Sequence, residues 1–338
     1  GLGEMMNFPG ILTSSEHTHG IVDETLKTGK IVTGHYSMPE TGKGLNAYIA
    51  SGVRCCHEST RAEDALAKMR LGMYAMLREG SAWHDLHEVA KSITQNKVDT
   101  RFAVLISDDT HPNTLLNQGH LDHIVRRAVE EGIDVITAIQ MVTINCAQCY
   151  QMDHELGSIT PGKCADIVFI KDLDSLEITK VIINGNTVAE NGKIAFEPAP
   201  YKYPEWATKS MHIKNKITKD SFAIHADGDK VTARVIEVIP AKVGSIERHI
   251  ELKVKDGLVN SDTTQDALKA AVFERHHNTG KVGFGFIKGF GIKCGAMAST
   301  VAHDAHNLLV IGTNDEDMAL AANTLIACGG GMTVVQNG

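Results

Sequence analysis

Several features that define other protein classes are missing from this sequence. No apolar run approaches the roughly 18 residues that a helix needs to cross a bilayer. The first residues, Gly1-Leu2-Gly3-Glu4-Met5-Met6, lack the basic and apolar segments of a secretory signal peptide. Positive charge is not in excess either, because 33 Lys and Arg stand against 41 Asp and Glu, for a net charge of -8. We therefore expect neither a membrane nor a nucleic acid to be the main partner.

A disulfide framework is also missing. The seven cysteines are odd in number and scattered without a regular spacing, which favours reduced thiols and a cytoplasmic protein. The pair Cys146-x-x-Cys149 lies in an apolar helical pattern, and no second pair accompanies it. A zinc or redox role for this pair is therefore not expected.

What the sequence does contain is a regular alternation of short apolar runs and helical patterns up to about residue 151. Strands separated by helices of this length predict parallel β/α units. The predicted strands cover residues 31–35, 53–57 and 102–106, and the predicted helices cover 45–50, 62–76, 118–131 and 135–149.

Beyond residue 151 the pattern changes to β structure. Residues 157–170 read as a turn followed by a strand, and residues 181–188 as a hairpin around Asn184-Gly185. A proline-rich stretch at 197–205 and a lysine-rich run up to Lys219 resemble a linker. The last region begins with β segments such as 230–236 and ends in a helix that opens at Asn314. We predict three domains, at residues 1–152, 153–200 and 201–338.

Three of the predicted strands end in residues that bind metals. His35, His57 and Asp108 follow strand-like runs, and β/α barrels place their chemistry at the carboxyl ends of strands. Each residue alone has a simpler interpretation, a hydrogen-bonded histidine or a helix-capping aspartate. Together they favour a metal site, because imidazole and carboxylate suit Zn, Fe and Mn. A bound metal would acidify a water molecule, and Asp108 could then carry its proton.

The first region contains a series of short motifs: Gly3-Glu4-Met5-Met6-Asn7-Phe8-Pro9-Gly10, Gly34-His35, Leu45-Asn46-Ala47-Tyr48, Cys56-His57-Glu58, Arg78-Glu79-Gly80-Ser81, Ser107-Asp108-Asp109 and Gly119-His120-Leu121-Asp122. These motifs resemble those of the adenine deaminases of the amidohydrolase superfamily. Residues 157–170 are similar to a strand-forming segment that is shared across the superfamily, and residues 276–278 and 301–307 are similar to the C-terminal domain of adenine deaminases.

The resemblance implies a fold and a set of roles. The fold would be α/β: the C-terminal part of a (β/α)8 metal-dependent hydrolase barrel (strands 4 to 8), a small β module and a C-terminal α+β domain. Glu4 would bridge two metal ions, His35 and His57 would bind the second ion, and Asp108 would contact the first and act as acid and base. The implied ions are Mn or Fe, with Zn as an alternative.

The implied reaction is the hydrolysis of adenine to hypoxanthine and ammonia. Asp109 is a candidate contact to a purine nitrogen, and Glu58, His111 and His120 are further candidates for substrate contacts. Glu58, Arg78 and Glu79 could line the same pocket, but they fit paired surface charges at least equally well. We also expect a homo-oligomer.

The sequence departs from the family at one point. The first metal should also be bound by a His-x-His pair at the end of the first barrel strand, and no such pair precedes Glu4. His17-Thr18-His19 comes later, in a helical pattern, so we do not expect it to replace that pair. We interpret the chain as an internal piece of a longer enzyme with an incomplete metal site. Two alternatives stay open: an amidohydrolase acting on a cyclic amide or another amino-purine, and a truncated, non-catalytic relative.

Overall fold

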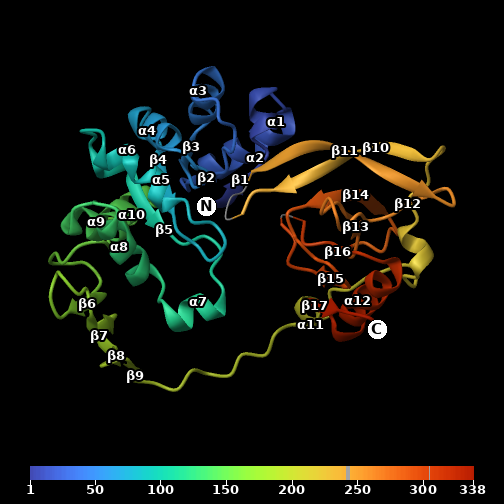
Figure 1. The fold of residues 1–338 in the computed structure, drawn as a ribbon. Helices are drawn as coiled ribbons and strands as arrows, with labels where there is room; N and C mark the ends of the chain where they lie inside the picture. Colours follow the sequence, from blue (N-terminus) through green and yellow to red (C-terminus); the bar gives the residue numbers. More distant parts are fainter. Residues whose placement is uncertain (241–243, 304) are drawn as a thin grey trace. The chain divides into compact units, whose positions relative to one another are not determined.

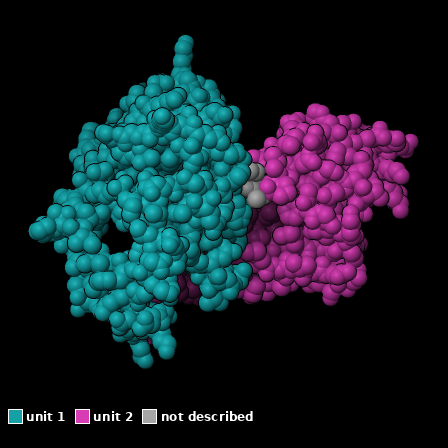
Figure 2. Space-filling view, turned by 60° about the vertical axis from the view of Figure 1, so that its left-hand side comes forward, with its two compact units in different colours: residues 1–198 teal, residues 199–338 magenta. Residues whose placement is uncertain are grey.

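The computed structural model describes residues 1–240, 244–303 and 305–338, so Asp304 of the motif at 301–307 lies outside the described residues. The chain forms two compact units, Gly1–Pro198 and Ala199–Gly338, which Figure 2 shows in different colours. The boundary falls within the proline-rich stretch at 197–205. Each unit has its own buried core.

A parallel sheet forms the centre of the first unit (Figure 1). Its strands pair in the order in which they occur in the sequence, and every pairing is parallel. Their carboxyl ends therefore lie along one edge, where residues that are distant in sequence can meet. In the described ladders β1 and β5 each pair on one side only. The strands are β1 (Leu2–Met5), β2 (Val32–Gly34), β3 (Val53–Cys56), β4 (Tyr74–Arg78) and β5 (Ala103–Ile106).

Helices connect these strands, and their buried residues pack with those of the strands to form the core of the first unit. α2 begins where Ser15 accepts a hydrogen bond from the Thr18 N–H, a typical N-cap. No helix of the described residues has the length and apolar composition to cross a membrane. The helices are α1 (Phe8–Leu12), α2 (Glu16–Lys27), α3 (Lys43–Ala50), α4 (Ala62–Arg70), α5 (Leu86–Val89), α6 (Lys91–Thr94), α7 (Pro112–Asn117), α8 (Leu121–Glu130), α9 (Val135–Val142) and α10 (Ile144–Cys149), with a 3-10 turn at Thr100–Phe102.

The helix predicted for residues 62–76 was wrong over its second half. α4 ends at Arg70, and Gly72 takes a left-handed φ of 80° that a helix cannot continue through. The chain then enters β4, which is buried at every position. Met73 and Met76 continued the apolar rhythm of the helix because a strand covered on both faces is apolar throughout. The sequence patterns therefore missed β4.

The helical pattern at 135–149 is also divided. α9 ends at Val142, and Thr143 leaves the helical region with φ -121° and ψ -95° before α10 starts. The strand predicted for 102–106 is confirmed as β5, and α8 falls within the helix predicted for 118–131.

A separate antiparallel sheet completes the first unit. β7 and β8 form the predicted hairpin, and both turn residues, Asn184 and Gly185, have positive φ, as a tight two-residue turn requires. The four strands are β6 (Ile167–Ile170), β7 (Ile178–Ile183), β8 (Asn186–Glu190) and β9 (Lys193–Ile194).

The second unit is built on an eight-stranded, mainly antiparallel sheet with the strand order β12-β11-β10-β14-β13-β16-β15-β17. Ile217 and Phe222 are buried in its core. The lysine-rich run that ends at Lys219 was predicted to be part of a linker, but it belongs to the folded unit. The elements are α11 (Glu205–Thr208), a 3-10 turn (Lys219–Phe222), β10 (Lys230–Val238), β11 (Ser245–Lys255), β12 (Leu258–Val259), β13 (Leu268–Phe273), β14 (Val282–Lys288), β15 (Ala296–Ser299), β16 (Leu308–Gly312), α12 (Asp315–Cys328) and β17 (Met332–Val335).

Candidate active site

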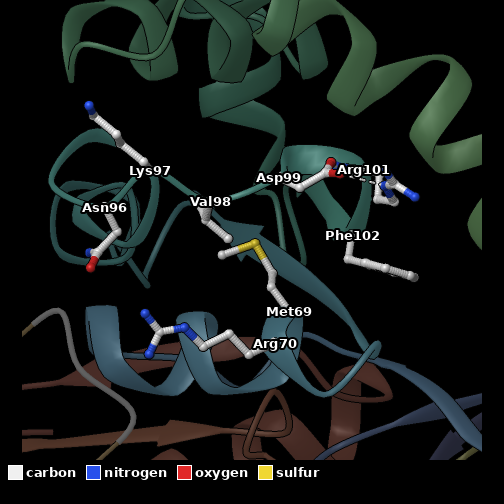
Figure 3. Close-up of a pocket in the computed structure, with 8 residues that line it drawn as sticks. All are labelled: Met69, Arg70, Asn96, Lys97, Val98, Asp99, Arg101 and Phe102. Atoms are coloured by element: carbon white, nitrogen blue, oxygen red, sulfur yellow. Dashed lines mark hydrogen bonds and ion pairs between the residues drawn. The ribbon is translucent and has the colours of Figure 1, made fainter.

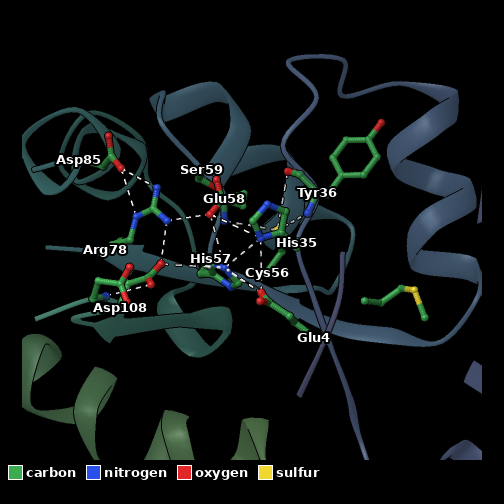
Figure 4. A network of polar contacts seen from close by, with 12 residues as sticks. Glu4, His35, Tyr36, Cys56, His57, Glu58, Ser59, Arg78, Asp85 and Asp108 are labelled. Atoms are coloured by element: carbon green, nitrogen blue, oxygen red, sulfur yellow. Dashed lines mark hydrogen bonds and ion pairs between the residues drawn. The ribbon is translucent and has the colours of Figure 1, made fainter. Parts of the chain in front are cut away.

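The carboxyl edge of the parallel sheet brings together three predicted metal ligands. Glu4 lies near the end of β1, and His35 and His57 directly follow β2 and β3. Glu4 Oε2 is 3.4 Å from His35 Nδ1 and 3.2 Å from His57 Nε2. The two imidazole nitrogens are 3.3 Å apart, so all three donors point to one spot (Figure 4).

The environment of His57 favours its metal-binding form. Burial lowers the pKa of this imidazole, although the carboxylates of Glu58, Asp108 and Glu4 oppose the shift. A lowered pKa keeps the ring neutral near pH 7, and only a neutral imidazole has a nitrogen lone pair free for a metal.

A buried arginine links the fourth predicted ligand to this group. Asp108 follows β5, and its Oδ2 accepts a hydrogen bond of 2.7 Å from Nη1 of Arg78, the last residue of β4. The same Nη1 donates to Glu58 Oε1 at 2.7 Å, and Nη2 donates to Asp85 Oδ2 at 3.0 Å. Glu58 Oε1 in turn lies 3.4 Å from His57 Nε2, so the arginine network and the histidines are contiguous (Figure 4).

The charges of this network do not balance. Burial disfavours the charged guanidinium of Arg78, but the carboxylates of Glu58, Asp108 and Asp85 outweigh it and raise the Arg78 pKa. One guanidinium thus faces three carboxylates, and Glu4 adds a fourth beside the histidines. Excess negative charge at a partly buried site favours a bound cation.

The donor set fits a divalent metal ion. Ligands bound tetrahedrally at 2.0–2.2 Å lie about 3.3–3.6 Å from one another, close to the separations of 3.2–3.4 Å among Glu4, His35 and His57. Among the described residues, two groups of three bring their donor atoms within 4.8 Å: Glu4, His35 and His57, and His57, Glu58 and Asp108. Imidazole with carboxylate suits Zn, Fe and Mn. The residues can therefore hold divalent metal.

The backbone around Asp108 is tightly constrained. Asp108 has a φ of 57°, a left-handed conformation that aspartate tolerates better than most residues, and its Oδ1 accepts the N–H of Asp109. Gly80, two residues after β4, packs against this loop, and a Cβ there would lie 2.6 Å from the Ser107 carbonyl oxygen and 2.8 Å from that of Asp109. Ser81 completes the connection by donating its N–H to the Asp109 carbonyl. The two loops are therefore joined by close packing and a hydrogen bond.

The predicted substrate contacts lie in different surroundings. Glu58 is buried in the metal group, so it is not a surface charge. The backbone of Asp109 is held by Asp108 and Ser81. His111 is exposed at the start of α7, and His120 is exposed and contacts Ser107 Oγ through Nε2 at 2.9 Å. The structure thus places Glu58 among the candidate metal donors and the two histidines at the starts of α7 and α8.

Several other residues lie outside this group. Glu79 is buried and turned away, because its carboxylate contacts His84 Nδ1 and the Leu86 N–H. His17 and His19 lie on α2, and the metal groups of the described residues include neither. A cavity of about 410 Å³ opens at the amino-terminal end of β5, the opposite end of the sheet from the metal group (Figure 3). It is lined by Met69, Arg70, Asn96, Lys97, Val98, Asp99, Arg101 and Phe102.

Arg78 was left open between a pocket residue and a paired surface charge, and Asp85 was missed. The structure places Arg78 in the site, because it is buried and paired with Glu58 and Asp108. Arg78 directly follows the apolar run 73–77. If that run is interpreted as a strand, Arg78 lies at its carboxyl end, beside the other metal-site residues. Asp85 gave no signal that spacing could detect.

Comparison with known proteins defines the class. The chain matches the amidohydrolase family over residues 3–188, and it belongs to that family. The expected fold class is confirmed: a parallel α/β sheet that is part of a (β/α)8 hydrolase barrel, followed by a C-terminal β-rich unit. Residues 244–338 match the adenine deaminase C-terminal domain, which narrows the relationship within the family.

Proteins called adenine deaminase resemble the chain along its whole length. The protein from Clostridium botulinum (strain Langeland / NCTC 10281 / Type F) is 77% identical over 339 residues, and that from Moorella thermoacetica is 52% identical over 340 residues. In both comparisons the alignment covers all of this chain and 57% of the relative. The chain thus spans little more than half the length of the curated relatives it matches.

Among solved structures, molinate hydrolase superposes with a TM-score of 0.42 and 20% identity, over 56% of this chain and 50% of that one.

Proposed function

We propose that this polypeptide is the metal-binding and C-terminal part of an enzyme that hydrolyses adenine to hypoxanthine and ammonia. One observation carries the proposal: the carboxyl edge of the sheet gathers Glu4, His35 and His57 beside an Asp108 that Arg78 anchors. The identity to relatives called adenine deaminase over the entire chain supports the choice of substrate.

The metal site is proposed to hold two divalent ions, Mn or Fe, with Zn as the alternative. When bound, such ions activate a water molecule for attack and polarise the reacting centre. Glu4 lies near both His35 and His57 and would bridge the ions, the two histidines would bind one of them, and Asp108 would contact the other. Glu58 forms one donor group with His57 and Asp108, and it would help to bind the ion that Asp108 contacts.

Asp108 is the proposed acid and base. Its Oδ2 pairs with Arg78, and its Oδ1 accepts a backbone N–H, so the carboxylate is held in one orientation. Its side chain is 21% exposed, so water and substrate can reach it. It would take a proton from the attacking water and return it to the leaving amine. Asp109, Glu58, His111 and His120 are proposed to contact the purine.

Three further features belong to the proposal. The domains would be a partial barrel at 1–152, a β module at 153–200 and an adenine deaminase C-terminal domain at 201–338. The enzyme would be cytoplasmic, which the seven free cysteines support. It would form a homo-oligomer, which size-exclusion chromatography with light scattering tests.

The decisive experiment measures ammonia release. The protein is purified at the length of its relatives, loaded with Mn²⁺, Fe²⁺ or Zn²⁺ in turn, and incubated with adenine, with hydantoin as a cyclic-amide competitor for the same chemistry. We expect ammonia and hypoxanthine from adenine and no ring-opened N-carbamoylglycine from hydantoin, with a His57→Ala protein as the inactive control. Absence of ammonia from adenine with every metal would reject the proposed function.

A further inference from the structure

Tyr48 connects the two strands that carry Glu4 and His35. It lies on α3 and is fully buried in the core beneath β1 and β2. Its hydroxyl donates a hydrogen bond of 2.6 Å to the carbonyl oxygen of Met5, the residue after Glu4. The same hydroxyl accepts the N–H of His35 at 3.0 Å. One oxygen atom thus holds both segments by their backbones.

The position of this contact matters because the strand ladder is irregular there. β1 and β2 pair at Leu2 with Val32 and at Met5 with Gly34, so β1 has one more residue than β2 between the two pairings. The extra residue lies in the Gly3-Glu4 segment. A bulge re-aims a side chain but also interrupts the ladder that would fix it. Backbone pairing alone therefore does not set where Glu4 lies relative to His35.

The Tyr48 hydroxyl is closely packed against the backbone of β2 at Gly34. A Cβ at Gly34 would lie 2.8 Å from the Tyr48 hydroxyl and 2.5 Å from Val53 Cγ1. The ring of Tyr48 packs against that of Tyr36, with centroids 5.2 Å apart. The hydroxyl is therefore a fixed point between the two segments.

We propose that Tyr48 is a positioning residue of the metal site. Its hydroxyl supplies the link between the β1 and β2 segments that the interrupted strand pairing does not, and it holds Glu4 and His35 close enough together to bind the same metal ion. The inference rests on the metal site of the proposed function, but not on its substrate. Groups that orient metal ligands without touching the metal change affinity by about 10- to 100-fold when they are lost. Loss of the Tyr48 hydroxyl should weaken metal binding by a similar factor.

Tyr36 provides a matched control. It is 1% exposed in the same core and also has one hydrogen-bonded hydroxyl, but that group donates to Glu40 Oε2 and not to the β1 or β2 backbone. Tyr36→Phe and Tyr48→Phe each remove one oxygen from neighbouring rings. A general loss of packing or stability would affect both variants alike.

The test is a metal titration of the metal-free proteins. Zn²⁺ or Mn²⁺ is added in competition with a chromophoric chelator, and folding is checked by circular dichroism. We expect Tyr48→Phe to bind at least about 10-fold more weakly than wild type and Tyr36→Phe to match wild type. If Tyr48→Phe is not fully folded, the three proteins are compared in trimethylamine N-oxide, which favours the folded chain without supplying the missing hydrogen bond.

Three results would overturn the inference: equal affinities of Tyr48→Phe and wild type, equal losses in both variants, or a wild-type protein that binds no metal. Failure of the proposed function looks different. A protein that binds metal, loses affinity in Tyr48→Phe and releases no ammonia from adenine would retain the inference and reject the reaction.

Discussion

Arg78 and Asp108 form an ion pair of 2.7 Å in which the arginine side chain is 1% exposed and the aspartate 21%. The pair therefore has a buried anchor and an accessible acid. It also joins the ends of adjacent strands β4 and β5, so the orientation of the proposed proton carrier depends on how well the parallel sheet is formed.

The first prediction concerns Asp108. Asp108→Asn should lower kcat by on the order of 100- to 10,000-fold, the usual contribution of a general acid and base. Folding should be largely spared, because asparagine matches aspartate in size and tolerates the left-handed φ of 57°. Metal content should fall, because Asp108 is also a proposed ligand. Ammonia release and metal analysis check this. Normal turnover of the variant would remove Asp108 from the mechanism, and Asp99→Asn, on the surface, serves as the control.

The second prediction concerns the buried cation. Arg78→Met should destabilise the fold by roughly 3–5 kcal/mol, because the buried carboxylates of Glu58 and Asp85 lose their counterion. Arg101→Ala, which breaks an exposed pair with Asp99, should cost less than about 1 kcal/mol. Urea unfolding of both variants gives the comparison. Similar losses in the two proteins would contradict the assignment of Arg78 as the anchor.

The third prediction concerns metal removal. A ligand that binds only the folded protein stabilises it by about 2.7 kcal/mol at a concentration 100 times its Kd. Chelation should therefore lower Tm, and Mn²⁺ or Zn²⁺ should restore it. His57→Ala should show a much smaller metal-dependent shift, while His19→Ala, on α2, should respond like wild type. A shift in His57→Ala as large as in wild type would locate the metal elsewhere.

The fourth prediction concerns acid stability of the second unit. The N–H groups of Thr279, His277 and His276 bond to the Glu274 carboxylate and lower its pKa from 4.5 to about 2. Since the folded-state pKa lies below the unfolded value, Glu274 stabilises the fold above pH 4.5, and this contribution is lost as the pH falls toward 2. Wild type should be more stable than Glu274→Gln at pH 6, with the difference shrinking by pH 2.5. A difference independent of pH in urea unfolding would contradict this.

The fifth prediction concerns the start of α12. Asn314 accepts the Asp317 N–H at 2.8 Å as the N-cap of the helix that packs on the second core. Asn314→Ala should cost about 1 kcal/mol, and Asn314→Ser, which keeps a capping oxygen, should cost less. Thermal unfolding ranks the variants. Equal stability of Asn314→Ala and wild type would show that the cap adds nothing.

Sequence patterns predicted the parts of this fold that depend on local signals. The Asn184-Gly185 hairpin and the cap at Asn314 are local chemistry, and the structure has both. The β/α alternation also indicated a parallel sheet. β4 was missed because its apolar residues continued the helical rhythm of α4, and a strand buried on both faces has no alternation to reveal it.

The residues of the candidate site also fall into those that local patterns indicate and those that only the fold shows. His35, His57 and Asp108 could be proposed because each follows a recognisable strand, and the family resemblance added Glu4. The functions of Arg78, Asp85 and Tyr48 depend on contacts between separate segments. Tyr48 occurs as an ordinary core residue of an amphipathic helix, and only the fold shows that its hydroxyl reaches Met5 and His35.

The one-sided pairing of β1 and β5 has a practical consequence. Such an edge presents free backbone donors and acceptors and can accept another strand, from the same polypeptide or from a separate one. This architecture is suited to fragment complementation: a second polypeptide that supplies strands for both edges could be added in trans. Recovery of metal binding or turnover would then report directly on assembly of the two pieces.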